Sequence, residues 1–490
     1  MTRVTSPLRT AAAVGLCLTV AVTLAACGSQ LEPQTVAQVN GTTTGGAGGS
    51  APDAAAGGGD AAGDAGVPGS TDAGGSGGAA DGSGGGSTAG GGAKADQGTG
   101  ANAAAGATKA GSCDGFKNQT GITDKTITIA NISDISGPVP GIFESAQQAT
   151  RAYVAYFNSA NDICGRKLDV QLLDSRADAG ADQQGYTKAC DDAFAAVGSM
   201  SAFDAGGAAA AQSCGLPDIR STTTTPERRD CTTCFAAQAV NPGEVGSAMP
   251  RYFASKYKDA SQHAAVLYIN AGAAPGNASA FRSAWSKSGW KIDYFQGIDV
   301  AEFNYAPYVQ QLKDQGVKLV NYTGPYQNTA KLLDAMKQQG FKPDVFIQDS
   351  TIYDQRFVDE AGGNADGVFA YSTTARFDDF SVKEMALYRS WLDQVKPGAV
   401  PNYFGLYAWS AARLFVERSV ALGGKLDRAS LIGALEGVKN WTGNGLHVPQ
   451  QVGSKNTANC TSVLQLSGGK WKQVSPGKYL CAPLVQAGGS

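Results

Sequence analysis

Short runs of β-branched and apolar residues alternate along the chain with longer segments in which apolar residues recur every three or four positions. The first run is TITIANIS at 126–133, and the helical pattern FESAQQATRAYVAYFNSA follows it. KLDVQLLDS at 167–175, AAVGSMS at 195–201 and LPDIRSTT continue the series. Strands that alternate with helices of this length indicate a parallel sheet covered by helices on both faces.

A second series of the same kind occupies residues 263–374, after a helix that we expect to start at Asn241-Pro242. Two successive series predict two lobes rather than one sheet. Beyond them the rhythm changes. Long helical patterns cover 403–422 and 428–439, and SVLQLSGGKWKQV then predicts a hairpin that turns at Gly468-Gly469.

The first 27 residues have the features of an export signal. Arg3 and Arg9 precede an apolar run at 11–26, and LAAC ends it at Cys27. A short apolar run with small residues at its end is typical of a signal peptide. LAAC resembles the bacterial lipobox, in which the cysteine is lipidated. We therefore expect a lipid anchor at Cys27 on the extracytoplasmic face of the cell membrane; the alternative is an uncleaved membrane anchor.

Residues 28–112 consist mainly of Gly, Ala, Ser, Thr and Asp. This composition buries too little apolar surface to offset chain entropy, so we expect a disordered tether before a folded domain at 113–490. Four of the 39 basic residues and seven of the 42 acidic residues precede Cys113, which leaves 35 of each in the folded part. A formally neutral domain argues against nucleic acid as a partner.

Eight of the ten cysteines lie beyond the tether, and an even number in an exported domain predicts disulfides. CTTC at 231–234 has two other interpretations, a redox pair or half of a zinc site. A zinc site needs further ligands, and the chain has only His263 and His447, so we expect no metal. Cys190 and Cys214 flank the third strand and its helix, and the pairing of Cys113 follows by elimination. The expected pairs are Cys113–Cys164, Cys190–Cys214, Cys231–Cys234 and Cys460–Cys481.

Motifs of enzymes are missing from the sequence. Residues 113–490 have no GxSxG, no GxxxxGK[ST] phosphate loop and no HExxH, and SxxK matches such as SKYK and SPGK lack a KTG partner. His263 starts a strand and His447 lies in a glycine-rich loop. We expect no catalytic residue, no cofactor and no enzymatic activity.

The loops that follow the predicted strands favour ligand binding. In open α/β sheets, ligands bind beyond the carboxyl ends of the strands. Here these loops read SDISGPVPG, SMSAFDAGG, STTTTPE, YTGPYQ and QDSTIYD, rich in hydroxyls, glycine and aromatics and poor in lysine and arginine. Hydroxyls and free amides suit a carboxylate or an amide, and we expect Phe143, Phe203, Tyr326 and Tyr353 to cover an apolar portion.

The order of these motifs resembles the leucine/isoleucine/valine-binding family of type I periplasmic-binding proteins, the solute receptors of ABC importers. The matching stretches are GITDKTITIANISDISGP, CGRKLDVQLLDS, AAVGSMSAFDA, CGLPDIRSTTTTPE and NADGVFAYST. The resemblance implies two parallel-sheet, Rossmann-like lobes joined by a hinge. Lobe 1 is expected at 113–240 and 372–445, and lobe 2 at 241–371 and 446–490.

The resemblance also implies positions for ligand contacts. In amino-acid-binding members, the ligand carboxylate is held at places that fall on Ser201, Ala202, Thr222 and Thr224. An aromatic partner falls at or beside Tyr326, and the acidic partner of the ammonium falls near Asp349, where this chain has no glutamate. The implied ligand is a branched-chain amino acid, an amide or another small carboxylate. The alternative for the threonine run is that it only ends a strand and bonds its own backbone.

As such a receptor, the protein closes on its ligand through a hinge near Val240, Tyr371 and Gly445. Its implied partners are an ABC permease and a separate ATPase subunit, since the chain has no phosphate loop. Two alternatives remain. One is a ligand sensor without a transporter, and the other is a cell-envelope scaffold that binds no ligand.

Overall fold

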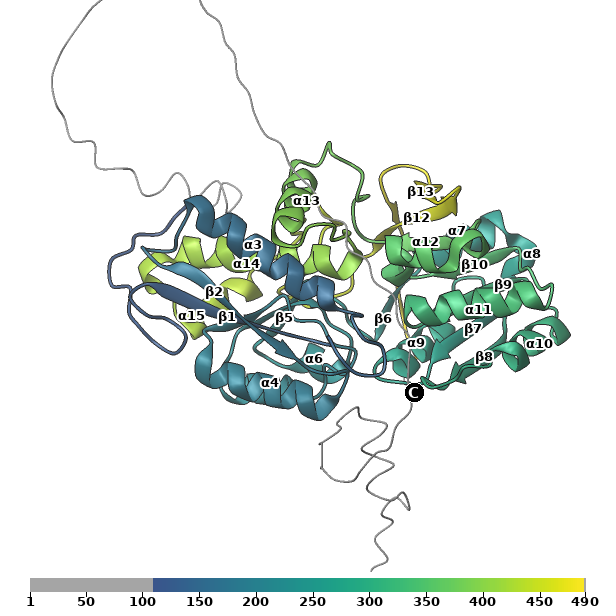
Figure 1. Ribbon diagram of the computed structural model, residues 1–490, viewed down its shortest axis with the longest axis horizontal. Helices are drawn as coiled ribbons and strands as arrows, with labels where there is room; N and C mark the ends of the chain where they lie inside the picture. Colours follow the sequence, from purple (N-terminus) through teal and green to yellow (C-terminus); the bar gives the residue numbers. More distant parts are fainter. Residues whose placement is uncertain (1–108, 489–490) are drawn as a thin grey trace, which may run out of the picture. The chain divides into compact units, whose positions relative to one another are not determined.

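The computed structural model of the protein describes residues 109–488. The expected signal peptide, the lipidation site Cys27 and all but the end of the expected tether lie outside the described residues. Two sheets organise the described chain, and we call the parts built around them lobe 1 and lobe 2 (Figure 1).

The sheet of lobe 1 has five parallel strands in the order β2-β1-β3-β4-β5. Their bounds are β1 Thr126–Ser133, β2 Lys167–Asp174, β3 Ala195–Val197, β4 Asp218–Thr222 and β5 Cys234–Gln238. Side chains of β1 alternate between two cores, because successive residues of a strand point to opposite faces. Ile127 and Ile129 belong to one core, whereas Ala130 and Ile132 belong to the other.

Helices cover both faces of this sheet, as the sequence pattern predicts. One group contains α3 (Glu144–Ala160), α13 (Lys383–Val395), α14 (Tyr403–Leu422) and α15 (Arg428–Glu436), and the other contains α4 (Ala179–Asp192), α5 (Ala208–Ser213) and α6 (Pro226–Asp230). Helix α14 is buried almost all round, between α3 and the sheet. The helices that follow lobe 2 in sequence therefore complete the core of lobe 1.

The sheet of lobe 2 has the order β13-β12-β11-β10-β9-β7-β8. Its bounds are β7 Ala264–Ile269, β8 Ile292–Ile298, β9 Leu319–Thr323, β10 Val345–Gln348, β11 Phe369–Ser372, β12 Cys460–Ser467 and β13 Lys470–Gln473. Strands β7 to β11 pair in parallel, whereas β12 pairs antiparallel with β11 and with β13. Gly468 and Gly469 both have positive φ, which confirms the hairpin turn predicted there.

The helices of lobe 2 are α7 (Ala248–Lys256), α8 (Lys258–Ser261), α9 (Ala274–Ser286), α10 (Ala306–Asp314), α11 (Tyr326–Gln338) and α12 (Gln355–Ala361). The helix that we expected from Asn241-Pro242 begins only at Ala248. The preceding residues form strand β6 (Glu244–Gly246), which pairs antiparallel with β15 (Leu484–Gln486). The sequence pattern did not predict this strand, because its partner β15 lies far away in the sequence.

The first described residues are fastened to lobe 1. The amide of Gly111 donates to the carbonyl of Val420 over 2.9 Å, and the amide of Gly424 donates to the carbonyl of Ser112 over 2.7 Å. A Cβ on Gly424 would lie 2.0 Å from the carbonyl oxygen of Asp114, so this contact requires glycine. The chain therefore enters the folded domain along the end of α14.

Every cysteine among the described residues forms a disulfide, in the same four pairs that the sequence predicted. They are Cys113–Cys164, Cys190–Cys214, Cys231–Cys234 and Cys460–Cys481. The first links the beginning of the domain to the turn before β2. The last joins β12 to β14 (Leu480–Cys481), which lies beside the hairpin.

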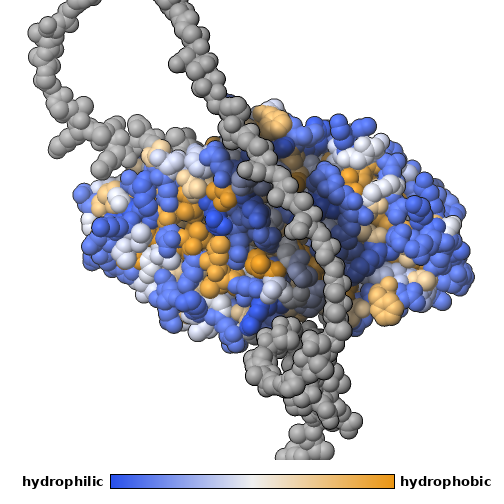
Figure 2. Space-filling view, viewed as in Figure 1, coloured by the Kyte–Doolittle hydropathy of each residue, from blue (hydrophilic) through white to orange (hydrophobic). Residues whose placement is uncertain are grey.

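The two lobes present different surfaces on the face shown in Figure 2. Apolar side chains gather over lobe 1, whereas lobe 2 is mostly hydrophilic there. Among residues 109–488, no helix combines the length and apolar character needed to cross a membrane.

Candidate ligand-binding site

A cleft of about 420 Å³ lies where the strands of both lobes end. Its lobe 1 wall comes from the residues that follow β1, β2, β3, β4 and β5. The wall of lobe 2 comes from the residues that follow β7, β8, β9 and β10, and from β11. Ligands of open α/β sheets bind at such carboxyl ends, so this cleft is the candidate binding site.

Five residues predicted for lobe 1 line the cleft: Phe143, Ala202, Phe203, Thr222 and Thr224. Ser201, the sixth, does not. It is fully buried behind the wall, and its hydroxyl oxygen accepts a hydrogen bond from the amide of Phe203 over 3.0 Å.

The threonine run serves three structural purposes. Thr222 is the last residue of β4, and Thr222, Thr223 and Thr224 all line the cleft. Thr225 caps α6, because its side chain accepts a hydrogen bond from the amide of Arg228. The run therefore ends a strand, forms part of the cleft wall and starts a helix.

Asp134 ties three loops of lobe 1 together. One of its oxygens accepts from the hydroxyl of Ser175 over 2.6 Å and from the amide of Ala177 over 3.2 Å, and the other accepts from the amide of Ala202 over 2.9 Å. Burial raises the pKa of Asp134, although these hydrogen bonds oppose the rise. Sequence reasoning missed this residue because an aspartate at the start of a loop carries no distinctive pattern.

Asp204 holds the threonine run in a similar way. Its Oδ2 accepts from the amide of Thr224 over 2.9 Å, and its Oδ1 accepts from the hydroxyl of Thr225 over 2.6 Å. The carboxylate is fully buried. The backbone of this wall is thus fixed by a side chain from the neighbouring β3–α5 loop.

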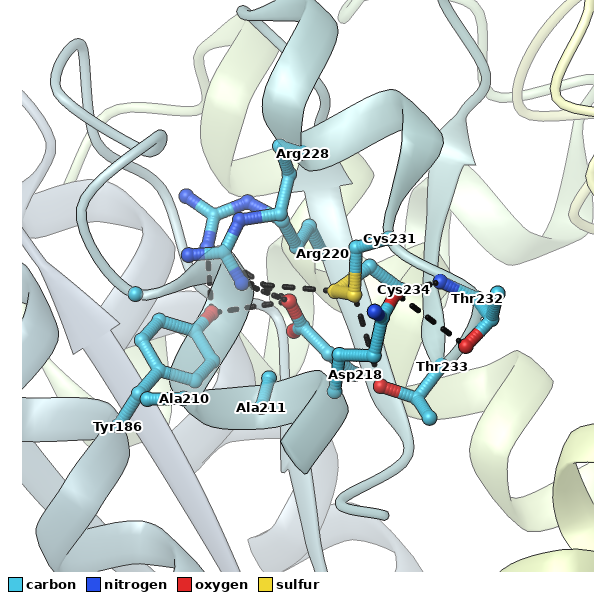
Figure 3. The surroundings of a disulfide bond; sticks show 12 residues. Tyr186, Ala210, Ala211, Asp218, Arg220, Arg228, Cys231, Thr232, Thr233 and Cys234 are labelled. Carbon is cyan, nitrogen blue, oxygen red and sulfur yellow. Dashed lines mark hydrogen bonds and ion pairs between the residues drawn. A yellow bond between two sulfur atoms is a disulfide. The ribbon is translucent and has the colours of Figure 1, made fainter. Parts of the chain in front are cut away.

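Behind Asp204 lies a buried network of two arginines, two more aspartates and a tyrosine. Figure 3 shows four of its members, Tyr186, Asp218, Arg220 and Arg228. Arg228 pairs with Asp182 and with Asp218, each at 3.0 Å, and its Nε donates to the carbonyl of Asp204 over 2.8 Å. Arg220 lies 3.7 Å from Asp204 and 3.8 Å from Asp218. Buried charges persist only when they are paired in this manner.

Loss of solvent on burial is the largest influence on the pKa values of Asp182 and Tyr186 in this network. It raises the pKa of Asp182 to about 6, although Arg220 and Arg228 act in the opposite direction. Desolvation also raises the pKa of Tyr186, whose hydroxyl donates to Asp218 over 3.1 Å and accepts from Arg220.

The Cys231–Cys234 disulfide lies against the same network. Its Cys234 sulfur is 3.6 Å from Nη1 of Arg228, and both cysteines are buried. In the described part of the chain, histidine, cysteine, aspartate and glutamate side chains form no group of three or more that could hold a metal ion. CTTC is therefore placed as a local structural bridge below the threonine wall.

Asp349 lines the cleft from lobe 2, at the end of β10. One of its oxygens accepts from the amide of Thr351 over 2.9 Å, and burial raises the pKa of this carboxyl. Contrary to the prediction, Tyr353 does not line the cleft, because its buried ring stacks on Phe377. Tyr326 does not line the cleft either. It starts α11, and the guanidinium of Arg356 lies 5.2 Å from the centre of its ring.

Lobe 2 also supplies an apolar bay, by which we mean Val245, Met249, Phe281 and Trp285 where they line the cleft. The rings of Phe281 and Trp285 stack with centroids 4.7 Å apart and planes at 6°. Sequence reasoning missed these residues because they lie on β6, α7 and α9 rather than in the loops after the parallel strands.

The charged residues that line the cleft are all acidic: Asp134, Glu244 and Asp349. No lysine or arginine of residues 109–488 belongs to its lining. Glu244 accepts a hydrogen bond from the side chain of Gln486 at one oxygen, whereas its buried Oε2 has no hydrogen-bond partner in the described structure. The cleft therefore combines a negative lining with apolar walls.

The two lobes touch at the edge of the cleft. The amide of Ala273 in lobe 2 donates to the carbonyl of Ala202 in lobe 1 over 2.9 Å. Nη1 of Arg356, from lobe 2, donates to the carbonyl of Gly141 over 3.4 Å, while Asp354 pairs with its Nη2 at 2.7 Å. These bonds connect loops that are far apart in sequence.

Neither histidine lines the cleft. His447 is buried, which lowers its pKa to about 4, and its ring stacks on Tyr407 with centroids 4.9 Å apart. His263 is half-buried and lies 3.4 Å from Asp293. Both are placed as packing or surface residues.

Comparison with known proteins gives matches in both sequence and structure. The family described as "Periplasmic binding protein" matches residues 126–470. The Leu/Ile/Val-binding protein homolog 1 of Brucella abortus is 23% identical over 181 residues, which cover 37% of this chain and 46% of that protein. The match thus spans about half the length of this curated relative.

Solved structures match most of the folded region. The fatty acid ABC transporter substrate-binding protein from Thermomonospora curvata has a TM-score of 0.64 at 16% identity, over 75% of this chain and 96% of that one. A benzoate complex of a solute binding protein from R. palustris has a TM-score of 0.62 at 16% identity, over 74% of this chain and 98% of that one. The isoleucine complex of a branched-chain amino acid transporter substrate binding protein from Streptococcus pneumoniae has a TM-score of 0.60 at 18% identity. The match covers 74% of this chain and 100% of that one. At these identities the likeness establishes the fold alone.

Proposed function

The chain belongs to the family of periplasmic binding proteins, and from that premise we propose that it is a lipid-anchored receptor that captures a small solute and delivers it to an ABC importer. Its fold is the two-lobed type I fold of these proteins, as the sequence resemblance implied. The anchor is Cys27, on the extracytoplasmic face of the cell membrane.

One observation carries this proposal. The carboxyl ends of the parallel strands of both sheets meet around a single cleft of about 420 Å³, and loops of the two lobes bond to each other at its edge. A cavity of this size and composition is typical of a small-molecule site. The proposed solute classes are those that the sequence resemblance implied: an amino acid, an amide or a similar small carboxylate. Related proteins are described with isoleucine and with benzoate.

In this proposal, the lobes open and close at their connections. The chain passes between the two sheets after β5, after β11 and before β12. Val240 and Tyr371 line the cleft close to two of these connections. Closure buries the solute and forms the surface that a membrane permease recognises. The permease and its ATPase are separate chains.

We propose that the protein acts by binding its solute, as the solute-binding proteins that it resembles do. Among residues 109–488, neither histidine and no lysine belongs to the lining of the cleft. Cys460 reaches the lining, but it is held in a disulfide with Cys481.

A thermal-shift screen of the purified protein against amino acids, amides, small carboxylates and ureas tests the binding function. A true ligand stabilises the folded state by RT ln(1 + [L]/Kd), about 2.7 kcal/mol at one hundred times Kd. A cell-envelope scaffold shows no shift with any of them. Uptake of the identified ligand by cells that lack the protein then separates a transporter receptor from a sensor, because only the receptor is required for uptake.

A further inference from the structure

We propose that the cleft selects a solute with an apolar body and a polar end that donates hydrogen bonds from nitrogen, an amide or an amine, and that it discriminates against a free carboxylate. This inference rests on the proposed binding function and narrows its solute class. It follows from which hydrogen-bonding groups of the cleft wall are already engaged.

Three backbone donors of the lobe 1 wall already have partners. The amide of Ala202 donates to Asp134 over 2.9 Å, and the amide of Thr224 donates to Asp204 over 2.9 Å. The amide of Phe203 donates to the hydroxyl oxygen of Ser201. Two of the amides at the expected carboxylate site therefore already bind carboxylates, and these belong to the protein itself.

Two of the three threonine hydroxyls in this lining have acceptors for their protons within reach. Thr224 donates its hydroxyl proton to the carbonyl of Ser201 over 3.2 Å, and the hydroxyl of Thr222 lies 3.4 Å from the carbonyl of Thr223 and 3.5 Å from that of Gln238. A hydroxyl whose proton is engaged still has oxygen lone pairs that accept hydrogen bonds. At Ala202, Thr222 and Thr224, the positions of the expected carboxylate site, the wall therefore offers acceptors rather than donors.

Asp204 cannot readily release the threonine run in favour of a ligand carboxylate. The backbone carbonyl of Asp204 accepts a hydrogen bond from Nε of Arg228, and Nε of Arg220 lies 3.7 Å from its carboxylate. All three side chains are fully buried. A ligand carboxylate placed at Thr224 would approach this carboxylate without a new positive charge to compensate for it.

Lobe 2 adds further acceptors and no cation. Asp349 and Glu244 both line the cleft, and Oε2 of Glu244 is buried without a hydrogen-bond partner. An unpartnered buried carboxylate oxygen is costly, and a ligand N–H would satisfy it. Arg356, the cation that crosses between the lobes, is paired with Asp354 and does not belong to the lining.

The apolar bay specifies the other end of the solute. Phe281 and Trp285 form a stacked aromatic surface, and Val245 and Met249 lie with them in the same lining. Such a surface contributes affinity through buried apolar area, for an aliphatic chain or an aromatic ring alike.

Calorimetry of the purified protein with matched ligands tests the inference. Benzoate, benzamide and benzylamine share one apolar body, and hexanoate, hexanamide and hexylamine share another. We expect the amide or the amine to bind at least ten times more tightly than the carboxylate in each series, and the comparison of amide with amine identifies the preferred donor. Equal or tighter binding of the carboxylates would overturn the inference while leaving the binding function intact. If no ligand of any class binds, the proposed function fails and the inference fails with it.

Two variants locate the discrimination. Glu244→Gln and Asp349→Asn each remove one negative charge from the lining and retain the shape, so each is expected to narrow the gap between amide and carboxylate by several-fold. Glu360→Gln makes the same charge change at an exposed residue outside the cleft and is expected to leave the gap unchanged. A gap that is the same in all three variants and in the original protein would show that the charges of the lining do not set the selectivity.

Discussion

The amide of Ala273 and the carbonyl of Ala202 form a backbone hydrogen bond of 2.9 Å between the two lobes. Ala202 lies in the β3–α5 loop and also lines the cleft, where its own amide bonds Asp134. One residue therefore takes part both in the contact between the lobes and in the wall of the binding site. The distance between Ala202 and Ala273 is therefore a direct measure of lobe closure.

Gly272 makes this contact possible. Its φ is +54°, and a Cβ there would lie 2.6 Å from the carbonyl oxygen of Ala202. We predict that Gly272→Ala weakens ligand binding by roughly tenfold, because the left-handed conformation costs an L-residue about 1–2 kcal/mol and the methyl group also holds the lobes apart.

Gly276→Ala is the matched control for that variant, since an added Cβ there meets no atom within 4 Å. Calorimetry measures the affinities, and small-angle scattering with and without ligand measures closure. Unchanged affinity and closure in Gly272→Ala would show that the Ala202 contact is not used in the bound state.

The threonine wall provides a second prediction. Thr222→Val and Thr224→Val retain the side-chain shape but remove an acceptor, so we expect each to weaken binding by about 0.5–1.5 kcal/mol, or roughly 2- to 13-fold. Thr223→Val is expected to have a smaller effect, because alternate side chains of an extended chain point to opposite sides. Thr223 lies in the lining as well. If all three variants bind the ligand as tightly as the original protein, the threonine run only ends the strand and contributes no ligand contact.

The network behind the wall predicts a dependence of stability on pH. The pKa of Asp182 is raised from 3.8 to about 6 in the folded protein, so folding takes up a proton in this range. The stabilisation from this proton is fully present below about pH 4 and is lost as the pH rises through 6. Each pH unit in the window changes the free energy of unfolding by up to about 1.4 kcal/mol.

Asp182→Asn removes this titration, so the free energy of unfolding of the variant is expected to fall less between pH 4 and 7 than that of the original protein. Urea denaturation at a series of pH values measures the difference. Asp191→Asn, at an exposed position on the same helix α4, serves as the control and should follow the original protein. Parallel curves for Asp182→Asn and the original protein would contradict the prediction.

The disulfides are expected to differ in their contribution to stability. In the chain-entropy description, the contribution grows with the separation of the paired cysteines, which is 51 for Cys113–Cys164 and 3 for Cys231–Cys234. The corresponding free energies are about 4 and ~1.6 kcal/mol. Replacing both members of each pair with alanine and measuring the denaturation midpoint tests the order. A larger loss from the short bridge would indicate that its packing against Arg228 outweighs chain entropy.

The lipid anchor is testable through Cys27. Cys27→Ala removes the thiol that we expect to carry the lipid. The protein is then expected to appear in the medium rather than in the membrane fraction. One acyl chain alone gives only marginal membrane binding, whereas two or more hold a protein stably. Equal retention of the variant in membranes would favour an uncleaved spanning anchor.

Much of the fold was predictable from sequence, because strand and helix patterns are local. The alternation of buried strands with amphipathic helices indicated both parallel sheets, and Gly468-Gly469 identified the terminal hairpin. The β6–β15 pairing was not predictable, since it joins Glu244–Gly246 to Leu484–Gln486 across more than half of the folded domain. A three-residue strand carries too little pattern to indicate its partner.

The binding site was predictable only in part. Loops after parallel strands led to Phe143, Ala202, Thr222 and Asp349, all of which line the cleft. Trp285 is a helix residue whose presence in the lining depends on how α9 packs, and no local pattern reports this. Tyr326 failed to reach the lining for the related reason that α11 turns its ring toward Arg356.

The docking of residues 111–114 along the end of α14 has a mechanical consequence. Any pull transmitted by the preceding chain reaches the domain through the backbone bonds of Gly111 and Ser112 and the bridge of Cys113, all of which are made within lobe 1. Among the described residues, this entry segment makes these bonds with lobe 1 alone. Tension between the protein and its attachment point is therefore expected to pull on lobe 1 and to leave the opening and closing of the lobes unaffected.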